Sequence, residues 1–278
     1  MGKTQGVCKR LNIKLITFCG TDYDHKILPS FIKHYYDLGI EDILITLQSN
    51  EKGDKIEEAK HVCSTFGIDP YDIWVGEYTS QEMHERRLAA IKHTNPEWII
   101  HADIDELHEW PDKPLKILKE TKANAVQGVF VDRVSENGEM LEIDSGRCIK
   151  KQFPIKCNLM SKWFHGSWSP STGLVKMMAY RQGLEISRGG HVAESPKTKY
   201  IQGVDLSSYA DIRTTKRKSS SPYKVHHFKW HRATIEKLRR RIRTYKEKDY
   251  GWWRQSQNFL DYLDSNNGKI DIDNLEII

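Results

Sequence analysis

The sequence predicts an α/β fold with a mostly parallel sheet flanked by helices, because strand-like and helix-like segments alternate through its first 105 residues. Short apolar runs typical of buried strands recur at 14–19, 42–47, 73–75 and 98–100. Apolar residues at helical spacing fill the intervals between them, at 27–38, 55–66 and 80–93. Such alternation is typical of parallel strands joined by right-handed helical crossovers.

Two of these helices have recognisable ends. Gly39 follows the first helix at the position where a left-handed backbone favours glycine. Thr79-Ser80-Gln81-Glu82 matches a capping box, in which the Thr79 hydroxyl accepts a hydrogen bond from the backbone three residues later. Both ends support the predicted boundaries.

After Pro111 the alternation stops, and the second part of the chain is predicted to form an antiparallel or mixed sheet. Strand-like runs occur at 125–134, 174–180 and 223–230, and helices are expected at 114–121, 233–248 and 252–263. The polar segment 194–221 is expected to be a loop region. Since no repeat or linker divides the chain, we expect a single domain over 1–278, with parts at 11–112, 113–231 and 232–278.

Composition indicates an ordinary globular protein of a reducing compartment. Hydrophobic residues make up 38% and charged residues 29%, and no apolar run is long enough to span a membrane. The first ten residues are polar, without the apolar core of a signal peptide. The five cysteines are widely spaced without a C-x-x-C pair, which favours free thiols over disulfides or a zinc site. We therefore expect a cytoplasmic location.

The phosphate-binding loops of common nucleotide enzymes are absent. No G-x-G-x-x-G sequence follows the first strand, and there is no Walker sequence. This counts against dehydrogenases, P-loop kinases and ATPases. If the chain binds a nucleotide, its phosphates need another positive charge, such as a metal ion.

Four acids follow the apolar run at 98–100 within a short stretch, at Asp103, Asp105, Glu106 and Glu109. In an open α/β sheet, ligands bind at the carboxyl end of the strands, where this stretch is predicted to lie. Two carboxylates two residues apart on a strand point to the same side and repel each other unless a hard cation bridges them. Asp103 and Asp105 therefore predict a divalent-metal site for a diphosphate, with two solvated acids at a loop start as the alternative.

The positive charge is concentrated near the end of the chain. Residues 213–248 contain 14 Lys and Arg against two acids, whereas the whole chain has a net charge of +5. This basic segment favours an anionic partner, such as phosphates, a lipid headgroup surface or nucleic acid. Helical spacing within 235–245 weakens the nucleic-acid interpretation, because such a face is usually solvated.

The ordered combination of these motifs, over about residues 13–248, resembles glycosyltransferases of the GT-A type, specifically the family-2 and family-92-like group. The segment from Leu28 to Gly39 matches the helix before the second strand of that group. Its W-x-(apolar)-x-x-D-x-D-E signature matches Trp98, Asp103, Asp105 and Glu106. An arginine on the preceding helix corresponds to Arg86 or Arg87. The closing motif of a histidine, an aromatic residue and a basic helix matches His227-Phe228 and 235–243.

The resemblance implies a metal-dependent transfer from a nucleotide-sugar donor, by preference a UDP-hexose or UDP-pentose, with 11–112 as the donor half and 113–231 as the acceptor half. It assigns Mn²⁺ or Mg²⁺ to three ligands: Asp103, Asp105 and His227. His191, which follows two glycines, competes with His227 for this role. The residues implied for the donor nucleotide are Thr17, Cys19, Gly20, Asn50, Arg87 and Asp103.

The acceptor, implied to be a glycan or glycoprotein, is assigned to the second half. Aromatic rings stack on sugars, so Trp163 and Trp168 are candidate acceptor residues together with His191, with burial in the core as the alternative for both tryptophans. An inverting transfer also needs a general base, for which the loop region offers Glu194, Asp205 and Asp211, unranked.

Two further functions remain as alternatives. One is nucleic-acid binding through the basic segment 213–248, which predicts a steep salt dependence. The other is a metal-dependent phosphodiesterase or nucleotidyltransferase, which also uses paired acids.

Overall fold

The computed structural model describes residues 11–159, 175–193, 195, 197–202, 220–248, 251 and 253–278. The strands are β1 (Ile13–Gly20), β2 (Ile43–Ser49), β3 (Asp72–Val75), β4 (Trp98–His101), β5 (Glu106–Glu109), β6 (Ala125–Val134), β7 (Ile155–Cys157), β8 (Val175–Arg181), β9 (Tyr200–Gln202) and β10 (Lys224–His227). The helices are α1 (Thr21–Asp24), the 3-10 helix η1 (His25–Ile27), α2 (Leu28–Asp37), α3 (Asp54–Thr65), α4 (Ser80–Thr94), α5 (Pro114–Glu120), α6 (Ile149–Gln152), α9 (Arg232–Glu247) and α10 (Trp253–Ser265).

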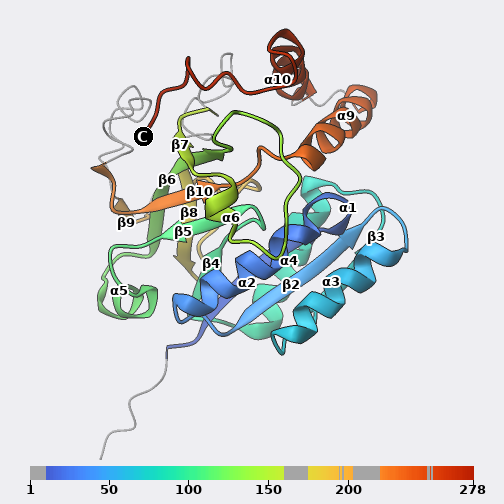
Figure 1. The fold of residues 1–278 in the computed structure, drawn as a ribbon. Helices are drawn as coiled ribbons and strands as arrows, with labels where there is room; N and C mark the ends of the chain where they lie inside the picture. Colours follow the sequence, from blue (N-terminus) through green and yellow to red (C-terminus); the bar gives the residue numbers. More distant parts are fainter. Residues whose placement is uncertain are drawn as a thin grey trace, which may run out of the picture.

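The described strands form one ten-stranded sheet (Figure 1) in the order β3-β2-β1-β4-β8-β6-β10-β5, with β7 and β9 paired to β6. The first four strands of this order are parallel. Beyond them, β8 is antiparallel to both β4 and β6, and β10 lies parallel to β6 but antiparallel to β5. The predicted fold class, a mostly parallel first half with a mixed second half and C-terminal helices, is confirmed.

Helices cover both faces of the parallel strands. On one face, Leu15 of β1 packs in a core cluster with Phe31 of α2 and Ala59 of α3. On the other face, Ile16 of β1 packs with Met83 of α4. Figure 1 shows α2 and α3 on the near side of β1 and β2, with α4 behind. Because successive strand residues point to opposite faces, the continuous apolar run of β1 serves both layers.

The capping predictions hold at both positions. Gly39 has φ +81° and follows the C-cap of α2. Thr79 is the N-cap of α4, and its Oγ1 accepts from the Glu82 amide at 3.1 Å. These local signals placed the helix boundaries to within a few residues.

Two local features differ from the prediction. The strand expected at 223–230 ends at His227. The acidic stretch contains the unpredicted strand β5. Its polar residues Glu106 and His108 are buried because they pair with β10 and with groups from other strands, and this burial has no signal in the local sequence.

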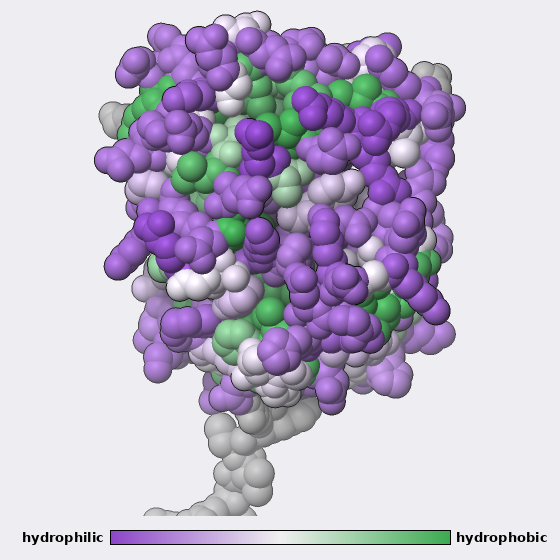
Figure 2. Space-filling model, turned by 45° about the vertical axis from the view of Figure 1, so that its right-hand side comes forward, coloured by the Kyte–Doolittle hydropathy of each residue, from purple (hydrophilic) through white to green (hydrophobic). Residues whose placement is uncertain are grey.

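No helix within the described ranges is long and apolar enough to cross a membrane. The face shown in Figure 2 is mostly hydrophilic, and its hydrophobic residues are scattered among polar ones.

Candidate active site at the carboxyl edge of the parallel strands

A cavity of about 270 Å³ lies where β1 and β2 end, between the turn after β4, the end of β10 and one face of α9. It lies at the edge of the sheet that the sequence predicted for a ligand. Its walls combine carboxylates, amides, aromatic rings and basic side chains. The lining residues that enter the discussion below are Phe18, Gly20, Tyr23, Asp24, Gln48, Asn50, Glu77, Tyr78, Asp103, Asp105, His227, Lys229, Lys237, Arg240, Arg241 and Tyr245.

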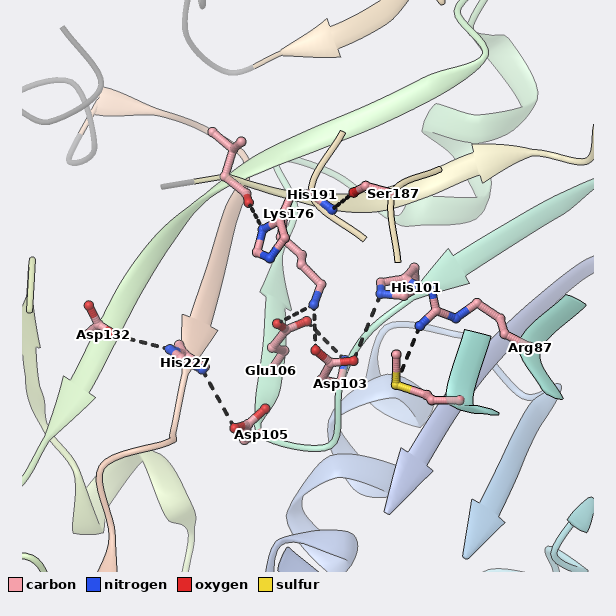
Figure 3. A network of polar contacts seen from close by, with 12 residues as sticks. Arg87, His101, Asp103, Asp105, Glu106, Asp132, Lys176, Ser187, His191 and His227 are labelled. Atoms are coloured by element: carbon pink, nitrogen blue, oxygen red, sulfur yellow. Dashed lines mark hydrogen bonds and ion pairs between the residues drawn. The ribbon is translucent and has the colours of Figure 1, made fainter. Parts of the chain in front are cut away.

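Asp105 and His227 face each other across one wall of this cavity (Figure 3). His227 Nε2 lies 3.7 Å from Asp105 Oδ2. Backbone pairing holds them together, because β10 is antiparallel to β5 and the Phe228 amide donates to the Asp105 carbonyl at 2.7 Å. This pairing places Asp105 and His227 close together, although more than a hundred residues separate them in the sequence.

The second ring nitrogen of His227 determines its tautomer. Nδ1 lies 3.1 Å from Oδ1 of Asp132, a fully buried carboxylate that also accepts from Trp230 Nε1 at 2.9 Å. Because a carboxylate only accepts, Nδ1 carries a hydrogen, and in the neutral ring Nε2 presents its lone pair toward Asp105. A histidine oriented in this way by a buried carboxylate is a typical metal ligand.

Asp103 also lines the cavity, but its environment differs from that of Asp105. β4 ends at His101, and both aspartates lie in a turn closed by the Glu106 amide, which donates to the Asp103 carbonyl at 2.9 Å. Asp103 Oδ2 accepts from Lys176 Nζ at 2.6 Å. The strand alternation assumed from the sequence does not apply in a turn.

Lys176 compensates two carboxylates at once. Its ammonium, which is 2% exposed, also lies 2.9 Å from Glu106 Oε1, and Glu106 Oε2 accepts from the Asp103 amide at 3.0 Å. Burial raises the pKa of Asp103, but Lys176 outweighs burial and holds that pKa well below its usual range. Burial raises the pKa of Glu106 to about 7 despite Lys176, and the nearby negative charges of Asp103 and Asp105 add to the rise.

The donor set at Asp105 fits a divalent ion that shares its ligands with a substrate. Within the described residues, no group of three His, Cys, Asp or Glu is arranged to hold a metal. Asp105 and His227 offer one carboxylate and one oriented imidazole, and Mg²⁺-type sites commonly use one or two protein carboxylates with substrate phosphates and water. Of the three ligands expected from the sequence, Asp105 and His227 face each other, whereas Asp103 is paired with Lys176.

Some of the residues predicted for the nucleotide line the cavity and others do not. Gly20, Asn50 and Asp103 line the cavity. Thr17 and Cys19 do not: Thr17 is 1% exposed, and Cys19 is fully buried in the core cluster against α2 and α3. Their assignment needs correction, because alternation along the strand turns Phe18, not its neighbours, toward the cavity.

Arg87 also lies outside the cavity lining. It is 2% exposed on the face of α4 that packs on the sheet, with Nη2 3.7 Å from Met83 Sδ. Figure 3 shows its guanidinium pointing toward His101. Its Nε and Nη1 make no hydrogen bond among the described residues. The neighbouring Arg86 forms ion pairs with Asp72 and Glu82 instead.

His191 lies in the same polar region, held by the turn that precedes it. Its Nδ1 lies 2.8 Å from the Val175 carbonyl, which leaves Nε2 as an acceptor. Burial and the charge of Lys176 lower the pKa of His191 to about 4. The ring of Phe130 lies between the two histidines, 6.0 Å from His191 and 5.0 Å from His227.

The remaining predicted site residues lie outside the described ranges: Trp163, Trp168, Glu194, Asp205 and Asp211. Conversely, the prediction missed a set of basic residues that line the cavity from β10 and α9: Lys229, Lys237, Arg240 and Arg241. The signal was present in the sequence, because residues three and four apart lie on one face of a helix and 237, 240 and 241 share that spacing.

No protein-family model and no curated protein matches this chain. Among solved structures, HddC from Yersinia pseudotuberculosis matches with 17% identity and a TM-score of 0.32 over 48% of this chain and 65% of its own. A 4-diphosphocytidyl-2C-methyl-D-erythritol synthase matches with 15% identity and a TM-score of 0.32 over 63% and 76%, and S. aureus TarS with 9% and 0.34 over 84% and 39%. At these TM-scores the similarities support no conclusion about the activity of this chain.

Proposed function

We propose that this chain is a metal-dependent glycosyltransferase that moves a hexose or pentose from a nucleotide sugar, by preference a UDP-sugar, to a hydroxyl group of a glycan acceptor. The observation that carries the proposal is the Asp105–His227 pair, 3.7 Å apart, on the wall of a cavity at the carboxyl edge of the parallel strands. Its position agrees with that expected for a donor diphosphate.

The nucleoside end of the donor is proposed to lie against β1 and β2. Asn50 Oδ1 is buried there and makes no hydrogen bond within the described residues. Gln48 Nε2 donates to the Gly76 carbonyl at 2.8 Å, which fixes that amide next to Asn50. An unpaired amide oxygen suits the N–H of a base or a ribose hydroxyl, and the rings of Tyr23 and Tyr78 in the lining offer stacking surfaces.

The metal is proposed to bind Asp105 and His227, with Asp132 holding the imidazole in the coordinating tautomer. When bound, the ion supplies positive charge that offsets the negative charge on the departing nucleoside diphosphate. Asp103 is proposed to contact the ribose with the oxygen that Lys176 does not engage.

The acceptor side carries the remaining proposed roles. Glu194, Asp205 and Asp211 stay the candidates for the general base that an inverting transfer requires. Trp163, Trp168 and His191 stay the proposed acceptor residues. Of these three, His191 is described, and its Nε2 lone pair can accept a hydrogen bond from an acceptor hydroxyl.

The test is a thermal-shift screen with UDP-, GDP- and dTDP-sugars, each with Mn²⁺ and with EDTA. A ligand at 100 times its dissociation constant adds roughly 2.7 kcal/mol of apparent stability, which such a screen detects. We expect one nucleotide family to stabilise the protein with Mn²⁺, and Asp105→Asn to abolish the metal-dependent part. Asp112→Asn, which removes a carboxylate that is 45% exposed, is the matched control and should leave the shift unchanged.

Product analysis then separates transfer from the alternative chemistries. A glycosyltransferase releases nucleoside diphosphate from the nucleotide sugar, together with free sugar when water is the acceptor. Release of pyrophosphate from a nucleoside triphosphate would instead indicate a nucleotidyltransferase, and cleavage of a phosphodiester would indicate a hydrolase. Absence of any nucleotide-dependent shift would refute the donor site.

A further inference from the structure

Helix α9 carries two different sets of basic side chains. Lys237, Arg240 and Arg241 line the cavity. Arg239 and Arg243 lie on the outer surface, 59% and 66% exposed, and both are within ion-pair distance of Glu236. Some basic side chains of α9 therefore line the cavity, and others are exposed to solvent.

Most of the cavity-facing cations lack a carboxylate partner. The exception is Lys237, whose Nζ lies 2.6 Å from Asp24 Oδ2 and forms an ion pair with it. Within the described residues, Lys229, Arg240 and Arg241 form no ion pair. The charged group of Lys229 lies over the ring of Trp230, and that of Arg241 lies over the ring of Tyr245.

The carboxylates of the cavity are largely engaged elsewhere. Of the four that line it, Asp24 pairs with Lys237, Glu77 with Lys248 and Asp103 with Lys176. The fourth, Asp105, shares the cavity with the three cations that form no ion pair among the described residues, which are Lys229, Arg240 and Arg241. Three cations without a carboxylate partner thus line the cavity together with Asp105, and cations held close together in a partly desolvated cavity attract an anion.

We propose that Lys229, Arg240 and Arg241 form a diphosphate-binding wall, so that the donor leaves as a nucleoside diphosphate held by this chain's own cations. The diphosphate of a nucleotide sugar carries two negative charges, which these cations can offset. A single guanidinium group can bind two phosphate oxygens at once, and Arg240 and Arg241 both line the cavity. The wall replaces the role assigned to Arg87, which lies outside the cavity lining.

The placement of these cations favours a small phosphate ligand over nucleic acid. They line a cavity whose other lining residues include members of β1 and β2 and Tyr78, which precedes α4. A nucleic-acid backbone would instead contact the outward-facing Arg239 and Arg243. The two sets can therefore be tested separately on the same helix.

This inference rests on the proposed function for the nucleoside part of the ligand, but its phosphate part can be tested alone. The experiment measures the dissociation constants of UDP, GDP, dTDP, uridine and inorganic pyrophosphate by calorimetry, in Mn²⁺ and in EDTA. The cavity variant is Arg240→Gln/Arg241→Gln, and the matched control is Arg239→Gln/Arg243→Gln. Neither removes an ion pair from the core, so both should fold, as thermal unfolding will verify.

We expect the cavity variant to bind its nucleoside diphosphate about tenfold more weakly or worse, in EDTA as well as in Mn²⁺, with the control unchanged. Uridine binding should be equal in all three proteins. Equal diphosphate affinity in wild type and cavity variant would overturn the wall and leave the donor proposal intact. A third outcome is that wild type and control bind pyrophosphate, the cavity variant does not, and none of the three binds a nucleotide. This result would support the wall and refute the donor proposal. Binding of neither ligand would overturn both.

Discussion

The ammonium of Lys176 lies 2.6 Å from Asp103 Oδ2, joining β8 to the turn between β4 and β5. The same nitrogen lies 2.9 Å from Glu106 Oε1, and the side chains of Lys176 and Glu106 are each 2% exposed. Lys176 therefore holds two acids of the turn in place. Asp105, which it does not contact, is the acid left to face His227.

Lys176→Met is expected to destabilise the protein by about 3 kcal/mol, because it leaves two carboxylates without their partner. Adding Glu106→Gln should recover part of that loss, since the amide removes one of the uncompensated charges. Urea unfolding of the two single variants and the double variant measures the coupling. Strictly additive effects would show that the two residues do not depend on each other.

The elements of the fold were predictable because their signals are local. Gly39 and Thr79 mark helix ends through backbone conformation and a side-chain cap, and both are found in those roles. β5 was missed because its burial depends on β10, more than a hundred residues away, and on Lys176 of β8. A polar strand buried by distant partners carries no periodic apolar signal.

The site was predictable in position but only partly in its residues. Asp105 and His227 were predicted and face each other. The ion pair of Asp103 was not predicted, because its partner Lys176 comes from a strand whose place beside β4 depends on the sheet order. The basic wall was visible as a charge cluster, but which of its members face inward depends on how α9 packs.

Gly190→Ala should destabilise the protein markedly more than Gly183→Ala. Both glycines have positive φ, +69° and +85°, so an alanine costs about 1 kcal/mol of backbone strain at either. At Gly183 an added Cβ meets nothing within 4 Å, whereas at Gly190 it would lie 2.2 Å from His101 Nε2. The clash should raise the cost at Gly190 to about 3 kcal/mol. Urea unfolding compares the two variants, and equal losses would contradict the contact with His101.

Asp132→Asn is expected to weaken Mn²⁺ binding about tenfold while leaving the fold intact. The amide oxygen can still accept from His227 Nδ1 and Trp230 Nε1, which contact the same oxygen, but the negative charge that strengthens the imidazole as a ligand is lost. The measurement is a Mn²⁺ titration at saturating nucleotide, followed by thermal shift. Glu109→Gln, which alters a carboxylate bonded to the neighbouring His226, is the control. An unchanged Mn²⁺ affinity in Asp132→Asn would argue against His227 as a ligand.

Asp24 should contribute to stability at neutral pH and cease to do so in acid. Its carboxylate lies 2.6 Å from Lys237 Nζ and 3.5 Å from His231 Nε2, and its side chain is 4% exposed. Burial alone would raise the pKa of Asp24, but Lys237 and His231 outweigh burial and lower it to about 2. Because the folded pKa is below the ordinary value of 3.8, the charged form stabilises the fold above that value, and this contribution disappears as the pH falls through about 2.

Asp24→Asn should therefore lower the free energy of unfolding by about 2 kcal/mol at pH 7. The difference from wild type should shrink below pH 4 and be small near pH 2, where the wild-type carboxyl is half protonated. Urea unfolding at a series of pH values measures it, with Asp112→Asn as an exposed control that should follow the wild type throughout. A difference that stayed constant down to pH 2 would mean that the Asn side chain disturbs packing. The loss of stability could then not be attributed to the charge of Asp24 and its ion pair with Lys237.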